Sequence, residues 1–162
     1  MRLHDLVIEE SDAAKIDEIL MNFLRDSGAT EALLIDRSGQ PLAMSGKFGS
    51  LDPISISALA AGAFASTGAM AQLLGEPEFT VLFHQGVKAN IYVSTVDDHT
   101  ILMAIFGEST TVGMVRLFAR ETIRGIEAVL TEARTRSRQP LGLGGPLSVD
   151  EAGSAFRELP AD

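Results

Sequence analysis

The chain has 162 residues, of which 46% are hydrophobic and 22% charged, and its formal net charge is −9. This length favours one domain with a real hydrophobic core, with room for a tail. The negative charge argues against binding to nucleic acid or to an anionic membrane surface, because both depend on cationic contacts with phosphates. The sequence has no cysteine, which excludes disulfides and thiolate sites. The N-terminal stretch MRLHDLVIEESDAAK has no uninterrupted apolar run, so we expect no signal peptide and a cytoplasmic location.

The first predicted helix begins at Ser11 or Asp12, either of which can cap it, and stops at Ser27-Gly28. Its apolar residues repeat at i, i+3, i+4, i+7 and i+8, and Lys15 lies on its exposed side. These apolar residues are Ile16, Ile19, Leu20, Phe23 and Leu24. Two short strands follow within EALLIDRSGQPLAMSG, residues 31–46, joined by a turn at 36–39. Pro41 favours an edge position for the second strand.

The next segment, Pro53 to Gly75, contains no charged side chain. Asp52 can cap it as a helix, with Pro53 in the first turn. The helix is long enough to cross a bilayer. Its Ser, Thr and Gln side chains and its acidic flanks nevertheless argue against membrane insertion. We therefore predict a helix of a water-soluble domain.

A helical projection at 100° per residue divides this helix into two sides. The large apolar residues share one broad side, which we expect to lie on a sheet: Ile56, Leu59, Ala63, Met70 and Leu74, with Leu73 at the margin. The opposite side is small and uncharged: Ser57, Ala58, Ala61, Ala65, Gly68 and Ala69. A solvated side normally carries Lys, Glu or Arg, so we interpret this one as an intermolecular surface. The alternative is a helix buried on both sides within one domain.

Three further strands are predicted at residues 78–84, 88–96 and 100–106, where β-branched residues are frequent. A long helix then covers about 112–136. Its inner stripe consists of Val115, Phe118, Thr122, Ile126, Val129 and Ala133. The order of elements is therefore α-β-β-α-β-β-β-α. It favours an α+β sandwich in which helices pack on a five-stranded, mostly antiparallel sheet.

The C-terminal part divides by composition. We expect a domain at 1–138, a Gly/Pro-rich linker at 139–147 and a short amphipathic segment at 148–162. Ser148 and Glu151 have capping-box spacing. One side of the segment can be apolar, with Val149, Ala152, Phe156 and Leu159. Isolated helices this short are marginal in water, so we expect order only upon docking. The alternative is a tail without a role.

No catalytic or metal-binding constellation is predicted. The three histidines, His4, His84 and His99, are scattered and have no second ligand at suitable spacing. SGKF lacks the first glycine and the final Ser/Thr of a phosphate loop. We therefore predict no enzyme activity, no metal and no cofactor.

Arg116, Arg120 and Arg124 recur at i, i+4 and i+8 and form a cationic stripe along the last long helix. The stripe could meet an acidic partner. It could equally pair with Glu121 and Glu127 on the same helix, and the sequence leaves both readings open.

Four stretches together with the order of elements resemble the Roadblock / dynein-light-chain family. They are DRSGQ, AAGAFASTGAMAQLLGE, FHQGVK and TTVGMVRL. The resemblance covers roughly residues 10 to 136 and is strongest to the bacterial cell-polarity regulators within that family. The tail stretch LSVDEAGSAFRE also resembles the C-terminal segment of those regulators.

The resemblance implies a homodimer whose second helices pack side by side and whose sheets join. It implies a small Ras-like, MglA-like GTPase as partner, with two subunits per GTPase, and a location in the cytoplasm with enrichment at a cell pole through partners. Such a dimer stimulates GTP hydrolysis without an arginine finger, by holding the GTPase's own catalytic residues in place. The C-terminal segment would bind a separate GTPase surface and promote nucleotide exchange.

The residues expected to act follow from the helix pattern together with the resemblance. The dimer and GTPase surface would consist of Ala58, Ala61, Ala65, Gly68 and Ala69, with Lys15 and Arg120 as polar rim contacts. The tail would be anchored by Leu147, Ala152, Phe156 and Leu159. Two other functions remain open: a purely architectural Roadblock dimer that scaffolds other proteins, and a small-molecule sensor with a polar-lined cavity.

Overall fold

The computed structural model describes residues 2–3 and 6–138. The elements in chain order are β1 (Arg2–Leu3), β2 (Leu6–Val7), α1 (Glu10–Ser27), β3 (Glu31–Asp36), β4 (Pro41–Gly46), α2 (Pro53–Leu73), β5 (Val81–Gln85), β6 (Asn90–Thr95), β7 (Thr100–Phe106) and α3 (Val112–Arg138). The expected linker at 139–147 and segment at 148–162, with Leu147, Ala152, Phe156 and Leu159, lie outside the described residues.

Five strands form one antiparallel sheet in the order β4-β3-β7-β6-β5. The central strands β3 and β7 pair in register from Glu31↔Ile105 to Asp36↔Thr100, and all of β7 is buried. Strand β4 lies at one edge, as Pro41 predicts, and β5 lies at the other. The predicted α+β sandwich on a five-stranded sheet is confirmed.

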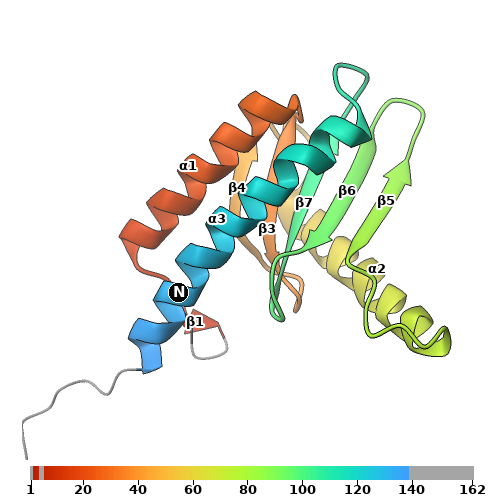
Figure 1. Cartoon of the computed structure of the whole chain (residues 1–162). Coiled ribbons are helices and arrows are strands. Elements are labelled where there is room, and N and C mark those ends of the chain that lie inside the picture. The colour runs from red at the N-terminus through yellow and green to blue at the C-terminus, as the bar shows by residue number, and fades with distance from the viewer. Residues whose placement is uncertain (1, 4–5, 139–162) are drawn as a thin grey trace, which may run out of the picture.

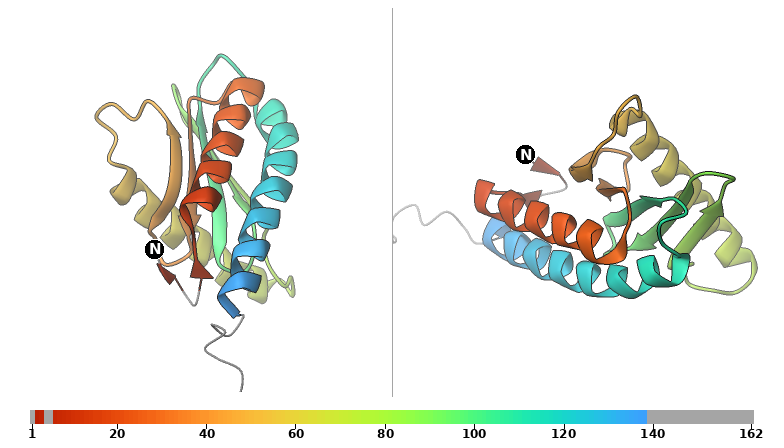
Figure 2. Two further views of the ribbon diagram at one scale, coloured as in Figure 1. Left: turned by 90° about the vertical axis from the view of Figure 1, so that its left-hand side faces the viewer. Right: turned by 90° about the horizontal axis from the view of Figure 1, so that it is seen from above.

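The three helices cover the two faces of the sheet unequally. Figures 1 and 2 show α1 and α3 side by side on one face and α2 alone on the other. Close contact between α1 and α3 is possible because Gly125 has no side chain: a Cβ there would meet Ile19 Cδ1 at 3.3 Å. The sheet therefore separates two cores. One packs Phe23, Leu102 and Leu130 under α1 and α3, and the other packs the opposite sheet face under α2.

The N-terminus of α1 differs by a few residues from the prediction. Glu9 is the cap residue, and Asp12 lies in the first turn, where its carboxylate accepts the Glu9 N–H at 3.0 Å. Asp12 is therefore the reciprocal partner of a capping box rather than the cap itself. The helix ends as predicted: Gly28, at φ 75°, donates its N–H to the Leu24 carbonyl at 3.1 Å.

The end of α3 is tied to the start of α1. Arg136 donates a hydrogen bond to the buried carboxylate of Asp12, and this bond raises the pKa of Arg136 above its ordinary value. A short β1–β2 pair, not foreseen from the sequence, lies nearby, and the Val7 N–H donates to Ser137 Oγ at 3.0 Å. These contacts hold the last turns of α3 against the domain up to the point where the tail begins.

The β6–β7 turn is joined to α3 by an ion pair between Asp97 and Arg134, at 2.5 Å. Burial alone would raise the pKa of Asp97. Hydrogen bonds from Arg134, the His99 N–H and the Thr100 hydroxyl outweigh burial, so the Asp97 pKa lies below its ordinary value of 3.8. An acid with a lowered folded-state pKa stabilises the fold above the unfolded pKa, and that stability is lost as pH falls through the folded value.

We therefore expect Asp97→Asn to lower the free energy of unfolding by about 1–3 kcal/mol at pH 7, because hydrogen bonds to a charged group are lost. The difference from the wild type should shrink below about pH 4, where the wild-type carboxyl also becomes protonated. Urea unfolding of the variant and the wild type at pH 7 and at pH 3 measures this difference in free energy at each pH. Asp98→Asn, at the exposed neighbouring position, is the control. If Asp97→Asn lowered the free energy of unfolding by the same amount at pH 7 and pH 3, the ionised Asp97 carboxylate would not be the stabilising group.

Candidate docking surface

Helix α2 begins where the sequence predicts. The Asp52 carboxylate accepts the N–H groups of Ile54 and Ser55 at 3.1 and 3.3 Å, and the Ser55 hydroxyl at 2.5 Å. The bond from the Ser55 hydroxyl, followed by that from the Ile54 N–H, holds the pKa of Asp52 below its ordinary value. The cap remains ionised at neutral pH, where its negative charge favours the helix N-terminus.

The side of α2 that faces the sheet is not the predicted one. Its buried residues are Ser57, Ala61, Phe64, Thr67 and Ala71. The large residues expected on the sheet are mostly turned to solvent: Leu59 is 74% exposed, Met70 52%, Leu73 88% and Leu74 72%, while Ile56 and Ala63 are half-buried. The predicted orientation of α2 was therefore wrong.

The reason for this orientation is visible in the sheet. Its α2 face already carries Leu33, Ile35, Ile101 and Met103, which fill the space between the layers. Small residues at the contact let the helix backbone come close, and Phe64 completes the packing together with half-buried Ile56. A helix that is uncharged all round, with small residues on every side, gives little periodic signal for which side turns inward.

Arg37, in the β3–β4 turn, holds α2 in this orientation. Its guanidinium lies 5.5 Å from the centre of the Phe64 ring and forms an ion pair with Glu78 at 2.7 Å. It also donates to the Asp97 carbonyl at 3.1 Å. In the same turn, Gly39 adopts φ 101°, and a Cβ there would come within 3.1 Å of Ala58 Cα. The turn therefore packs directly against the N-terminal half of α2.

A large apolar surface remains uncovered beside α2. Figure 1 shows the C-terminal turns of α2 extending beyond the sheet, where Met70, Leu73 and Leu74 lie exposed. A groove of about 260 Å³ runs between α2 and the β5–β6–β7 part of the sheet. It is lined by Ile56, Leu59, Ala60, Ala63, Leu82, His84, Ile91, Val93 and Met103. Exposed apolar patches that include large side chains mark interaction surfaces or grooves.

One helix of the described part, α2, is long and apolar enough to cross a membrane by length and composition. In this fold it packs along one side against the sheet through Ala61 and Phe64, as a helix of a folded domain does.

The predicted surface residues fall in three places. Ala58, Ala65 and Ala69 are exposed on α2, and Gly68 is half-buried. Ala61 is only 6% exposed and belongs to the core, so its assignment to the outer surface was wrong. Lys15 on α1 and Arg120 on α3 are exposed on the opposite side of the sheet, so a single chain does not bring them together with the α2 residues. The tail anchors are not described.

Sequence reasoning missed the large side chains on the accessible side, above all Leu59, Met70 and Leu73, together with Leu82 on β5. The available signal was the charge-free length of the helix, which indicated an interaction surface but not the side chains that form it.

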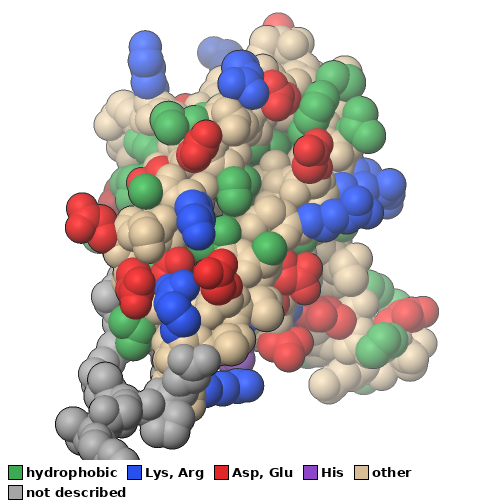
Figure 3. Space-filling model, turned by 60° about the vertical axis from the view of Figure 1, so that its left-hand side comes forward, with side chains coloured by type: hydrophobic (Ala, Val, Ile, Leu, Met, Phe, Trp, Pro, Cys, Tyr) green, Lys and Arg blue, Asp and Glu red, His purple; other side chains and the backbone are tan. Residues whose placement is uncertain are grey.

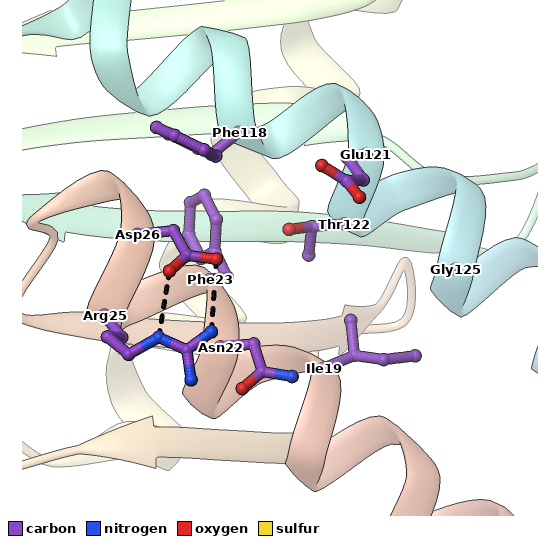
Figure 4. Close-up of a pocket in the computed structure, with 9 residues that line it drawn as sticks. All are labelled: Ile19, Asn22, Phe23, Arg25, Asp26, Phe118, Glu121, Thr122 and Gly125. Carbon is purple, nitrogen blue, oxygen red and sulfur yellow. Dashed lines mark hydrogen bonds and ion pairs between the residues drawn. The ribbon is translucent and has the colours of Figure 1, made fainter.

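A second groove, of about 380 Å³, lies between α1 and α3. Figure 4 shows Asn22 and Asp26 from α1 and Phe118 and Glu121 from α3 along its walls. The Arg25 and Asp26 side chains pair with each other at 2.9 Å and remain largely exposed, so they are typical of a helix surface. Within the described residues, no group of three His, Asp or Glu side chains could hold a metal ion. The described residues thus favour a protein-docking surface.

Comparison with known proteins agrees with this geometry. The family model of the Roadblock/LC7 domain matches residues 15–106. Myxococcus xanthus MglB has 30% identity and a TM-score of 0.73, with 79% of this chain and 96% of that chain covered. The gliding protein MglB from Thermus thermophilus has 33% identity and a TM-score of 0.73, covering 79% and 97%. A structure of MglB with a tetrameric arrangement has 32% identity and a TM-score of 0.75, covering 79% and 96%.

These matches confirm the resemblance inferred from sequence. No curated protein matches the chain.

The orientation of α2 can be tested with two alanines. Ala61→Leu should lower the free energy of unfolding by about 1–3 kcal/mol, because the added carbons have no room between helix and sheet. Ala128→Leu, on the exposed side of α3, makes the same chemical change and should alter it by less than about 0.5 kcal/mol. Urea unfolding at one protein concentration measures both. If the two variants changed the free energy of unfolding by the same amount, Ala61 would lie on the outer side of α2.

Proposed function

This chain belongs to the Roadblock/LC7 family, and from that premise we propose that it is a homodimeric regulator that stimulates GTP hydrolysis by a small Ras-like GTPase. The regulated process is cell polarity or motility. In this proposal the protein has no catalytic site of its own and works in the cytoplasm, enriched at a cell pole through its partners.

The observation that carries the proposal is the uncharged, uncovered side of α2. Leu59 and Leu73 expose 74% and 88% of their surface. Leaving such side chains in water costs free energy that a protein partner would recover, at about 25 cal/mol per Å² of buried apolar area. The adjacent groove between α2 and β5 extends this surface to the sheet edge. The similarity to proteins named MglB, one of them a gliding protein, supports a role in motility.

A second copy of the chain is the first partner in this proposal. Strand β5 ends the sheet, and most of its residues are exposed, so its outer backbone groups are available to pair with another strand. Pairing two β5 strands would place two α2 helices next to each other below a continuous sheet. Small residues such as Ala65 and Ala69 permit close approach of helix backbones at such a contact.

The GTPase would then bind the surface shared by the two α2 helices. That surface carries no cation on α2, so it offers no arginine finger from this helix. Stimulation would come from pressing the switch segments of the GTPase into place, so that its own catalytic groups are positioned before reaction. Lys15 and Arg120 would contribute polar contacts at the rim. The C-terminal segment would bind a different GTPase surface and promote nucleotide exchange.

An architectural dimer that binds partners without changing GTP turnover would use the same α2 surface. Measurement of GTP turnover by the small GTPase, with and without this protein, separates the two functions. Unchanged turnover in the presence of a demonstrated complex would favour the scaffold.

We expect Ala65→Arg to abolish GTPase stimulation and leave the fold intact, since Ala65 is exposed within one chain. A guanidinium buried without a partner at the contact costs at least about 3 kcal/mol, which corresponds to more than a hundredfold in affinity. GTP turnover measures stimulation, and circular dichroism checks the fold. Ala128→Arg on α3 is the matched control and should retain full stimulation. Normal turnover with Ala65→Arg would remove α2 from the proposed contact.

Truncation after Gln139 should preserve the homodimer, because α2 and β5, which form the proposed dimer contact, both lie before that residue. It should weaken GTPase binding or nucleotide exchange, because the segment at 148–162 is removed. Analytical ultracentrifugation gives the oligomeric state, and isothermal titration gives the affinity for the GTPase. Identical affinity and exchange rate in the two forms would contradict the role assigned to the segment.

A further inference from the structure

The groove beside α2 contains a single ionisable side chain. Eight of its nine lining residues are apolar, and the ninth is His84 on β5. Neighbouring residues of a strand point to opposite faces of the sheet. Leu82 and His84 therefore turn towards α2, whereas Phe83 turns to the other face and stacks on Phe106 at 6.1 Å. In the single chain His84 is exposed, so water reaches its imidazole.

No acidic side chain on the elements around the groove faces His84. Helix α2 has no charged residue from Pro53 to Leu73, and β6 and β7 contain no Asp, Glu, Lys or Arg. Tyr92, the other ionisable residue of these two strands, is buried in the core on the opposite face of the sheet. The charged side chains lie elsewhere: Figure 3 shows acidic and basic groups spread over the side of the molecule that carries α1.

The charged residues at the ends of the neighbouring strands also lie outside the groove. Lys88 is in the β5–β6 turn, and Glu108 follows β7. Glu78 precedes β5 and pairs with Arg37 at 2.7 Å. None of these residues lines the groove. A protonated His84 would therefore have no counter-ion there.

The open edge of β5 determines how a second strand can pair with it. At the two ends of the β5–β6 pair, the Thr95 N–H donates to the Thr80 carbonyl and the Gly86 N–H to the Ala89 carbonyl, each at 3.0 Å. Backbone groups alternate in direction along an antiparallel strand, so the even-numbered residues of β5 bond to β6. The odd-numbered residues turn their backbone groups to the open edge: Val81, Phe83 and Gln85.

A two-fold antiparallel pairing that uses the whole strand sets Phe83 opposite Phe83 of the second copy and Val81 opposite Gln85. Each His84 then lies opposite Leu82 of the second copy, on the face that carries α2. The two imidazoles become diagonal neighbours at about 7–8 Å.

The same pairing brings the exposed end of α2 towards the groove of the other copy. Figure 1 shows that this end lies towards the start of β5. Antiparallel pairing sets the start of one β5 against the end of the other, where His84 lies. Met70 and Leu73, which are 52% and 88% exposed, would then help to exclude water from His84 of the second copy. Glu76 follows these apolar turns and is the first acid after the helix.

We propose that acid weakens the homodimer through protonation of His84. This inference rests on the homodimer of the proposed function and adds a pH dependence to it. Imidazole ordinarily takes up a proton near pH 6.5. An apolar groove that closes over the ring favours its neutral form, and two imidazolium groups on one face repel each other. Separated chains therefore bind protons more readily than the dimer, so the dimer is strongest above about pH 6.5 and weakens as the pH falls below that value.

The overall charge of the protein predicts the opposite trend. The chain carries a net charge of −9, and acid makes this charge less negative. Repulsion between two copies then decreases, which by itself would strengthen association. Weakening in acid would therefore come from a local group rather than from net charge.

Fluorescence-detected sedimentation of the full-length protein measures the dissociation constant of the dimer at pH 7.5 and pH 5.5. We expect a rise of about a hundredfold at the lower pH, because each of two imidazoles contributes about tenfold per pH unit below 6.5. Asp and Glu side chains ordinarily remain ionised over this range.

Substitutions at two histidines identify the responsible group. His84→Gln stays neutral, so it should dimerise at pH 7.5 and change its dissociation constant by less than about threefold between the two pH values. His84→Lys carries a fixed charge and should weaken the dimer at both. His99→Gln, at an exposed position in the β6–β7 turn, is the matched control and should keep the full pH effect.

The outcomes separate this inference from the homodimer itself. A protein that remains monomeric at pH 7.5 at every concentration would overturn both. A dimer with the same dissociation constant at the two pH values, or a pH effect that survives in His84→Gln, would overturn only the role of His84. A dimer that acid strengthens would also overturn it, because an acid such as Glu76 of the second copy would then reach the imidazole.

Discussion

The close approach of α2 to a sheet face filled with large aliphatic side chains is the constraint on which the rest of the structure depends. Space between the layers admits Ser57, Ala61 and Phe64 but not a row of leucines. Turning the small side inward forces Leu59 and Leu73 outward. The apolar surface of this protein is therefore a consequence of how its core is packed, and it lies on a rigid helix rather than on a loop.

A surface of this kind suits regulation by contact. The described residues contain no grouped metal ligands, and the ion pairs Asp97–Arg134 and Asp12–Arg136 tie elements to each other. A partner protein that binds α2 meets a shape held in place by the sheet behind it. Preorganisation of this kind lowers the entropic cost of binding a partner.

The two faces of the domain are connected by a short series of polar contacts. The Arg37 guanidinium lies over the Phe64 ring of α2 and donates to the Asp97 carbonyl, and the Asp97 carboxylate binds Arg134 of α3. Further along α3, Arg136 binds Asp12 and holds the end of the helix from which the tail departs. The α2 surface and α3 are thus joined through a few buried or half-buried charges that come from the turns at 36–39 and 97–100.

Sequence alone determined the three helices and the strands of the five-stranded sheet, because helical spacing in α1 and α3, the Asp52 cap, the turn glycines and Pro41 act locally. It also predicted an interaction role for α2, since that helix is a long run without charge in an acidic protein. Only the tertiary structure decided which side of α2 is accessible: the helix is uncharged all round, and the side chains of the sheet select the inner face. It likewise showed that Arg116, Arg120 and Arg124 do not pair with Glu121 and Glu127, because spacing allows ion pairs in a helix but does not compel exposed side chains to form them.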